Sequence, residues 1–271
     1  MGLPITVELA PREVSEVSFA GILEEVFSYF ISVDERFSTY KNTSEIFKLN
    51  HEMKALVANG GAPQRDGART EQISNKKSEY PELVISAAMQ EVLELAKKTK
   101  QETHGYFDIQ KPDGSIDPSG IVKGWAIKNA ADLLRERGVK NFFIDAGGDI
   151  QTSGINADGK EWSVGIRNPF NKSEIVKVIY PRGRGVATSG SYERGNHIYN
   201  PLAPEQTLSE IVSITVIGPN VLEADRFATA AFAMGPKGIE FIETLVGFEA
   251  YSIDKNGIAT MTSNFGELTH S

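Results

Sequence analysis

The chain has 271 residues, of which 40% are hydrophobic and 24% charged, and its formal net charge is -8 at pH 7. This length suits one large domain over residues 1–271, or two closely packed subdomains with a site between them. The negative net charge argues against sequence-independent binding to nucleic acid, because such binding needs a surplus of lysine and arginine. The sequence contains no apolar run of membrane-spanning length, and without cysteine it has no disulfides and no thiol catalysis.

The first part of the chain is predicted to be mainly helical. Residues 3–10 alternate as a strand, and residues 17–40 carry apolar side chains at helical spacing. Residues 57–80 are rich in Gly, Asn, Ser, Lys and Arg without any period, which predicts a surface loop. A second helix is then expected, starting after a proline at position 81 and ending at Gly105.

Strands dominate the second part. A helix over residues 122–137, capped by Gly138, precedes a predicted strand at residues 141–147. Further short strands are expected at residues 161–169, 173–181, 185–192 and 210–218, with a hairpin at 248–262 that turns at Asn256-Gly257. Because strands and helices do not alternate strictly, the pattern favours an α+β architecture, with layered antiparallel or mixed sheets and flanking helices.

The stretch from Asn220 to Gly235 reads as an apolar helix that carries Asp225 and Thr229 four residues apart. Both oxygens lie on one helical face, where they can meet the same hard cation. The alternative is that Asp225 forms a surface ion pair with Arg226 or Lys237 while Thr229 bonds to its own helix. Taken alone, these residues favour the alternative, because two oxygens do not complete the octahedral shell of magnesium.

Residues 116–124, "IDPSGIVKG", predict a turn that opens a helix with Lys123 in its first turn. The N-terminus of a helix with a nearby lysine is a favourable binding site for phosphate, because free backbone N–H groups and the positive end of the helix dipole face the anion. The alternative is that Asp117 or Ser119 simply caps the helix, and the segment has neither Walker A nor dinucleotide-fingerprint spacing.

Two further polar clusters follow. Gly147 and Gly148 lie between Asp145 and Asp149. The glycines either make a plain turn or let the backbone approach a ligand, in which case the two aspartates could accept hydrogen bonds from sugar hydroxyls or ring N–H groups. The segment 185–201 is either a solvated hairpin or one wall of a site; its polar residues are Thr188, Ser189, Tyr192, Glu193, Arg194 and His197.

A series of blocks, in order along nearly the whole chain, resembles the ApbE-type FAD:protein FMN transferases. The blocks are Met1-Gly2 and residues 33–50, 103–110, 117–134, 145–154, 162–169, 186–194, 197–201 and 223–235. Each block is weak by itself, and their order makes the resemblance specific.

The resemblance implies a metal site and a flavin site. Asp225 and Thr229 would bind Mg²⁺ together with the backbone carbonyl of Gly120. The positions that would contact FAD are Met1, Tyr40, Tyr106, Phe107, Asp108, Asp117, Lys123, Thr188, His197 and Ile198. Their chemistry suits this role, since it offers aromatic faces, acids for hydroxyl and N–H groups, and a lysine for phosphate.

The implied reaction is Mg²⁺-dependent transfer of FMN from FAD to a threonine or serine hydroxyl of an acceptor flavoprotein, with release of AMP. His197 is the candidate proton acceptor because an imidazole titrates near neutrality, and Asp225 is the alternative base. The sequence departs from the family in having Asn200 where an acid is usual. Three alternatives remain open: an FAD pyrophosphatase giving FMN and AMP, a flavin-binding protein without turnover, and a magnesium-independent sugar or nucleotide binder.

The resemblance also bears on partners and location. The expected acceptor is a subunit of a redox complex or a flavoprotein reductase. The chain as written is expected in the cytoplasm, or in the cell envelope or periplasm if an N-terminal lipoprotein leader has been removed.

Overall fold

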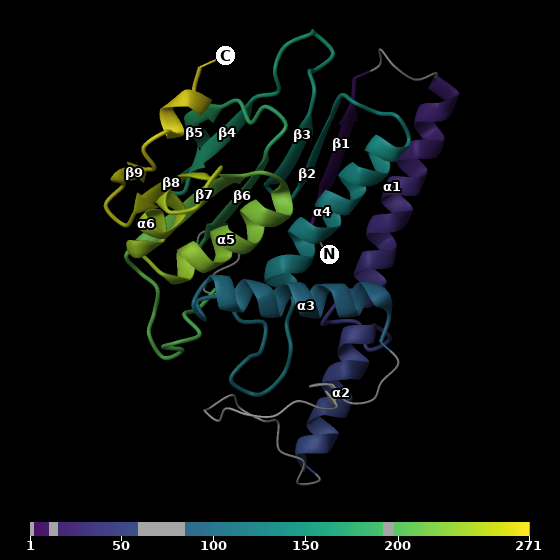
Figure 1. Ribbon diagram of the computed structural model, residues 1–271, viewed down its shortest axis with the longest axis vertical. Helices are drawn as coiled ribbons and strands as arrows, with labels where there is room; N and C mark the ends of the chain where they lie inside the picture. The colour runs from purple at the N-terminus through teal and green to yellow at the C-terminus, as the bar shows by residue number, and fades with distance from the viewer. Residues whose placement is uncertain (1–2, 11–15, 59–84, 192–197, 271) are drawn as a thin grey trace.

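The computed structural model describes residues 3–10, 16–58, 85–191 and 198–270. Its centre is a seven-stranded sheet in which every neighbouring pair of strands is antiparallel. The strands, in spatial order, are β1 (Ile5–Leu9), β2 (Phe142–Ala146), β3 (Asp149–Ser153), β6 (Gly185–Gly190), β7 (Ile211–Gly218), β8 (Glu249–Asp254) and β9 (Ala259–Met261). A separate hairpin pairs β4 (Val164–Asn168) with β5 (Asn171–Ile179) (Figure 1).

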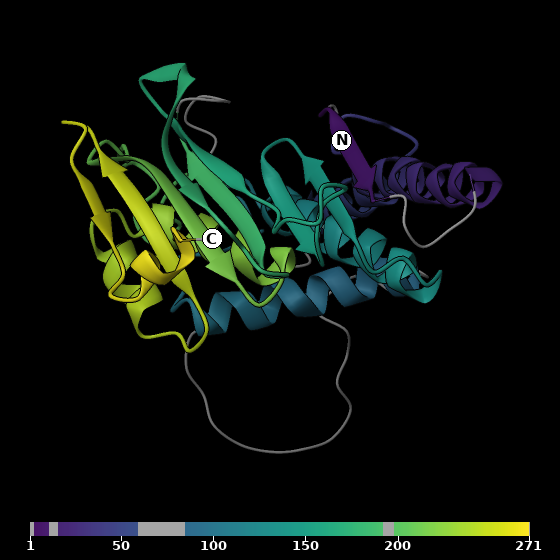
Figure 2. The ribbon, with the colours of Figure 1, turned by 90° about the horizontal axis from the view of Figure 1, so that it is seen from above.

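Helices cover one face of this sheet (Figure 2). They are α1 (Glu16–Phe37), α2 (Glu45–Ala58), α3 (Ala87–Glu102), α4 (Ser119–Glu136), α5 (Val221–Ala233) and α6 (Lys237–Glu243), and a short 3-10 helix follows at Phe265–Leu268. Among the described residues, no helix has both the length and the apolar character required to cross a bilayer.

Alternation along the strands divides the buried core between the two faces of the sheet. Ala187 and Val216 point to the helices and pack with α5, whereas their neighbours Val186 and Ile217 point to the opposite face. On that opposite face they pack with the β4–β5 hairpin and with Phe265 of the 3-10 helix. The result is a layered α+β fold, as the sequence predicts.

Several boundaries differ from the sequence-based expectation. The helix expected after the proline at 81 begins at Ala87, where the Ser86 hydroxyl caps it by accepting the Met89 N–H at 3.2 Å. The predicted loop overlaps the end of α2 at residues 57–58, and its remainder lies outside the described residues. The helix expected from residue 122 begins at Ser119, so Lys123 lies beyond its first turn.

Strand β3 was not predicted, and its side chains explain why. The sequence "DIQTS" reads as a polar turn, yet Asp149, Gln151 and Thr152 are all buried. The Gln151 amide donates to the carbonyl of Gly183 at 2.9 Å, and its Oε1 accepts the Val221 N–H at 2.9 Å. Polar side chains that are satisfied inside the protein remove the apolar alternation on which strand prediction depends.

Candidate active site

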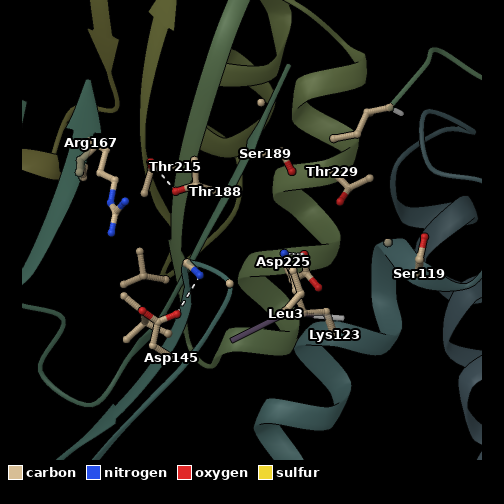
Figure 3. A pocket seen from close by; sticks show the side chains of 18 of the residues that line it. Leu3, Ser119, Lys123, Asp145, Arg167, Thr188, Ser189, Thr215, Asp225 and Thr229 are labelled. Carbon is tan, nitrogen blue, oxygen red and sulfur yellow. Dashed lines mark hydrogen bonds and ion pairs between the residues drawn. The ribbon is translucent and has the colours of Figure 1, made fainter. Parts of the chain in front are cut away.

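A cavity of about 620 Å³ opens between the starts of α4 and α5, strand β6 and the β4–β5 hairpin. This volume is within the range of ligand-binding pockets. Figure 3 shows Lys123, Thr229 and Ser119 on one side of the cavity and Arg167 and Asp145 on the other. Segments distant in the sequence therefore form the two walls.

The crossing of α4 and α5 places Asp225 at the base of the cavity. The Gly124 backbone N–H donates to Asp225 Oδ2 at 2.8 Å, and the aspartate is only 4% exposed. A Cβ added at Gly124 would lie 2.7 Å from the Asp225 Cβ and 3.0 Å from the Leu222 Cα. Only glycine permits this approach, because real Cβ atoms essentially never come so close to backbone or Cβ atoms.

Two buried carboxylates share one lysine at this position. Lys123 Nζ lies 2.6 Å from Asp149 Oδ2 and 3.9 Å from Asp225 Oδ1. The other oxygen of Asp149 accepts the backbone N–H of Thr188 on the neighbouring strand β6 at 3.2 Å. Burial, and then the charge of Asp149, raise the pKa of Asp225 to about 8 against the opposing effects of Lys123 and the Gly124 N–H.

Asp225 does not form the surface ion pair with Arg226 or Lys237 that the sequence pattern alone favours. The Arg226 guanidinium is buried and forms salt bridges with Glu102 on α3 and Glu223 on α5. It also lies 4.0 Å from the centroid of the Phe227 ring. Asp225 instead faces the cavity from inside the protein, where an unneutralised carboxylate is unfavourable.

The donors fit a hard cation such as Mg²⁺. A Cβ added at Gly120 would lie 3.8 Å from Thr229 Oγ1 and 3.3 Å from the Phe107 ring, so Gly120 and Thr229 are neighbours across the two helices. Together with Asp225, they offer a carboxylate, a hydroxyl and a backbone carbonyl, all of them oxygen ligands suited to magnesium. When both acids are ionised, the pair carries one negative charge more than Lys123 neutralises, and a bound cation would offset it.

In the part of the chain that is described, no cluster of three or more His, Cys, Asp or Glu side chains suggests a metal site. The expected ligand set does not require such a cluster, because two of its three members, Gly120 and Thr229, are not residues of these types. The expected site is thus distinct from an all-carboxylate or histidine metal centre.

Most positions expected to contact FAD line this one cavity. They are Tyr106, Phe107, Asp108, Asp117, Lys123, Thr188 and Ile198. Two of the acids are paired: Asp108 with Lys100 at 2.9 Å and Asp117 with Lys111 at 2.7 Å.

Asp117 holds its charge despite its burial. Burial raises the pKa of its carboxyl, but hydrogen bonds from Lys111 and Ser119 outweigh it and leave the pKa below the usual value. Pro118 occupies the cap position of α4 without a side-chain cap bond. Asp117 instead accepts the Ser119 N–H at 3.1 Å in a local turn, so neither Asp117 nor Ser119 is the cap residue of α4.

One expected contact, Tyr40, is not brought to the cavity. Tyr40 follows α1, does not line the cavity and is 96% exposed, because the chain leaves the core after Phe37. Met1 and His197 lie outside the described residues. Asn200, which replaces the usual acid, accepts the Leu202 N–H at 2.9 Å and stabilises a turn beside the cavity residue Tyr199.

Sequence reasoning missed the wall formed by the β4–β5 hairpin. Gly165, Arg167 and Ile175 line the cavity, and Arg167 pairs with Ile175 across an irregular part of the hairpin. Irregular pairing of this kind redirects side chains next to functional sites. The only signal was the block at residues 162–169, which the resemblance contained without assigning it a contact.

The fold and site define an α+β protein with a cavity of ligand-binding size and an acidic pair of helices beside it. The family model for the ApbE family matches residues 109–252, more than half of the chain. The chain belongs to the ApbE family.

Curated relatives support this assignment. An FAD:protein FMN transferase of Klebsiella pneumoniae is 25% identical over 279 residues, covering 90% of this chain and 80% of that protein. One from Escherichia coli is 30% identical over 166 residues, covering 58% of this chain. The match spans 47%, about half, of the length of the Escherichia coli protein.

Solved structures share the fold. The flavin transferase ApbE from Vibrio cholerae superposes with a TM-score of 0.78 at 20% identity, covering 99% of this chain and 96% of that one. The ApbE protein from Thermotoga maritima gives a TM-score of 0.77 at 18% identity, covering 100% and 97% of the two chains. At these identities the likeness establishes the fold alone.

Proposed function

We propose that this protein is an enzyme, an FAD:protein FMN transferase that uses Mg²⁺. The observation that carries the proposal is the convergence of Asp225, Thr229, Gly120 and Lys123 at one end of a single cavity. The names of the curated relatives support the same reaction class. The substrate is FAD, and the acceptor is a threonine or serine hydroxyl of a flavoprotein, such as a redox-complex subunit or a flavoprotein reductase.

The bond changes define the task of the site. The acceptor hydroxyl oxygen forms a bond to the phosphorus on the flavin side of FAD, and the bond from that phosphorus to the bridging oxygen breaks. The electron pair leaves with AMP, and the hydroxyl proton passes to a base. Positioning and charge stabilisation supply most of the catalysis in phosphoryl transfer.

This chain's residues divide the task between them. Asp225, Thr229 and the Gly120 carbonyl would hold Mg²⁺, which when bound offsets the negative charge of the diphosphate. Lys123 donates to a phosphate oxygen from the same end of the cavity. Tyr106 and Phe107 contribute to the aromatic lining of the cavity.

His197 remains the proposed base, on the sequence argument alone. Its neighbour Ile198 lines the cavity, so the backbone at residue 198 brings the chain to the site. Asp225 is a poorer base because coordination of a metal would occupy its free oxygen. We expect His197→Ala to slow turnover while FAD affinity is largely kept.

The test is incubation with FAD, Mg²⁺ and a candidate acceptor protein, with the acceptor mass and AMP followed in one tube. A mass gain equal to FMN minus one water, with equimolar AMP, supports transfer, and Asp225→Ala is expected to abolish it. AMP without a mass gain indicates a pyrophosphatase in which water replaces the acceptor hydroxyl. Bound FAD with neither product contradicts both, and Asn200→Asp then tests whether the missing acid is the cause.

A further inference from the structure

Asp149 has no assigned role, although burying its carboxylate reduces the stability of the protein. It is 1% exposed and lies at the first position of β3, the strand that pairs directly with β6. It shares Lys123 with Asp225, which is also buried. Two buried carboxylates that share one lysine reduce the stability of a fold. A role in the function of the site would explain why both are present.

Asp149 is held by the backbone of the sheet, and Lys123 reaches it from α4. The Thr188 N–H on β6 binds Asp149 Oδ1 at 3.2 Å, which fixes the direction of Oδ2. Oδ2 then lies 2.6 Å from Lys123 Nζ. The lysine has a flexible four-carbon stem and can reach more than one acceptor.

Asp225 is the competing acceptor. Its Oδ2 already accepts the Gly124 N–H, and its Oδ1 lies 3.9 Å from the same Lys123 Nζ. A close ammonium–carboxylate pair has a separation of about 2.7–2.9 Å, so a shift of about 1 Å would place the lysine on this oxygen. That oxygen is the one left for a metal ion.

We propose that Asp149 is a positioning residue that holds Lys123 away from Asp225 and so keeps Asp225 Oδ1 open for the divalent cation. The inference rests on the proposed metal site of the transferase. Without Asp149, the lysine pairs with Asp225 and occupies the position of the cation. With Asp149 in place, the lysine also remains next to the metal ligand, where it can donate to a phosphate group.

The experiment is a double-mutant cycle read by Mn²⁺ binding, using electron paramagnetic resonance and no flavin. The proteins are the wild type, Asp149→Asn, Lys123→Met and the double variant. We expect Asp149→Asn to weaken Mn²⁺ binding about tenfold or more when Lys123 is present, and about twofold or less when Lys123 is replaced by methionine. The expected non-additivity arises because the lysine, not the lost charge, blocks the site.

A matched control separates this effect from simple loss of negative charge. Asp145 also lines the cavity, but its Oδ1 accepts the Gly148 N–H at 2.8 Å, and no ion pair with a lysine is found for it in the described part of the chain. We expect Asp145→Asn to weaken Mn²⁺ binding about equally with or without Lys123. Circular dichroism and thermal unfolding of each variant establish that it is folded.

Two results overturn the inference. One is an Asp149→Asn effect of the same size in both backgrounds, which means that Asp149 acts only through its charge. The other is a wild-type protein that binds no Mn²⁺ in the absence of flavin. In that case Asp225 Oδ1 is not available to a cation in the flavin-free protein. Mg²⁺-dependent AMP release can persist in either case, so the proposed function is judged separately by the acceptor assay.

Discussion

The backbone N–H of Gly124 donates to Asp225 Oδ2 at 2.8 Å, and this bond joins two helices across 101 positions of sequence. It fixes one carboxylate oxygen and directs the other toward Lys123 and the cavity. The contact exists because α4 has no side chain at position 124, so α5 can approach its backbone closely.

Gly124→Ala is therefore expected to displace Asp225. The new methyl group would meet the Asp225 Cβ and the Leu222 Cα, and overpacking of this kind costs about 1–3 kcal/mol of stability. We expect AMP release to fall at least about tenfold, because small displacements of catalytic groups have large effects on rate. Steady-state kinetics and urea unfolding measure the two effects.

Gly21→Ala is the matched control for this substitution. Gly21 lies in α1, and a Cβ added there meets nothing within 4 Å. Replacement by alanine should raise stability by up to about 1 kcal/mol through helix propensity and leave turnover unchanged. Equal loss of activity in both variants would contradict the steric argument.

Asp225→Asn is expected to stabilise the metal-free protein. The pKa of the buried Asp225 carboxyl is raised to about 8, so at pH 7 the folded protein must keep a proton that the unfolded chain releases, and asparagine removes this cost of at least about 1 kcal/mol. We also expect Mg²⁺ to raise the melting temperature of the wild type but not of this variant, since ligand binding stabilises by mass action. Thermal unfolding with and without Mg²⁺ tests both, and a less stable metal-free variant would count against the cost of the buried pair.

The sequence was informative where periodicity or order along the chain carried the signal. The amphipathic spacing in α1 and α3 and the turn at Asn256-Gly257 predicted the elements that the structure contains. The order of short blocks predicted the family. Distances between blocks were not available from any of these patterns, because they depend on how helices and strands pack.

The missed features share a physical cause. The hairpin wall at Arg167 depends on irregular pairing between β4 and β5, which has no local sequence signature. For Asp149 the sequence indicates an acid beside a glycine turn that could accept a hydrogen bond from a ligand, but not its ion pair with Lys123, which joins β3 to α4. Tyr40 matched a family block, yet the end of α1 leaves it exposed.

Arg226 provides a test of how a buried charge anchors α5. Its guanidinium is buried between Glu102 and Glu223, whose side chains remain partly exposed. Arg226→Met keeps much of the packing, and the two glutamates can regain water, so we expect a loss of about 1–2 kcal/mol. Glu102→Gln combined with Glu223→Gln leaves the buried cation without its carboxylates, and we expect a larger loss of about 3–5 kcal/mol. Urea unfolding compares the variants, and the reverse order of stability would refute this account.

Gln151 connects β3 to the first residue of α5 and should be one of the more sensitive polar positions in the core. Gln151→Leu keeps the approximate volume but leaves the Val221 N–H and the carbonyls of Gly183 and Thr152 without this partner. Each buried backbone group that loses its hydrogen bond costs about 1–3 kcal/mol, so we expect a total loss of at least about 2 kcal/mol.

Thr152→Val is the control, because the neighbouring buried hydroxyl makes only a long contact of 3.5 Å to the Arg184 carbonyl. Its loss should cost less than about 1 kcal/mol. Since α5 begins at Val221 and carries Asp225 one turn later, Gln151→Leu should also reduce Mg²⁺-dependent stabilisation, whereas Thr152→Val should preserve it. Equal effects of the two variants on Mg²⁺ binding would show that the start of α5 is held by packing rather than by the Gln151 amide.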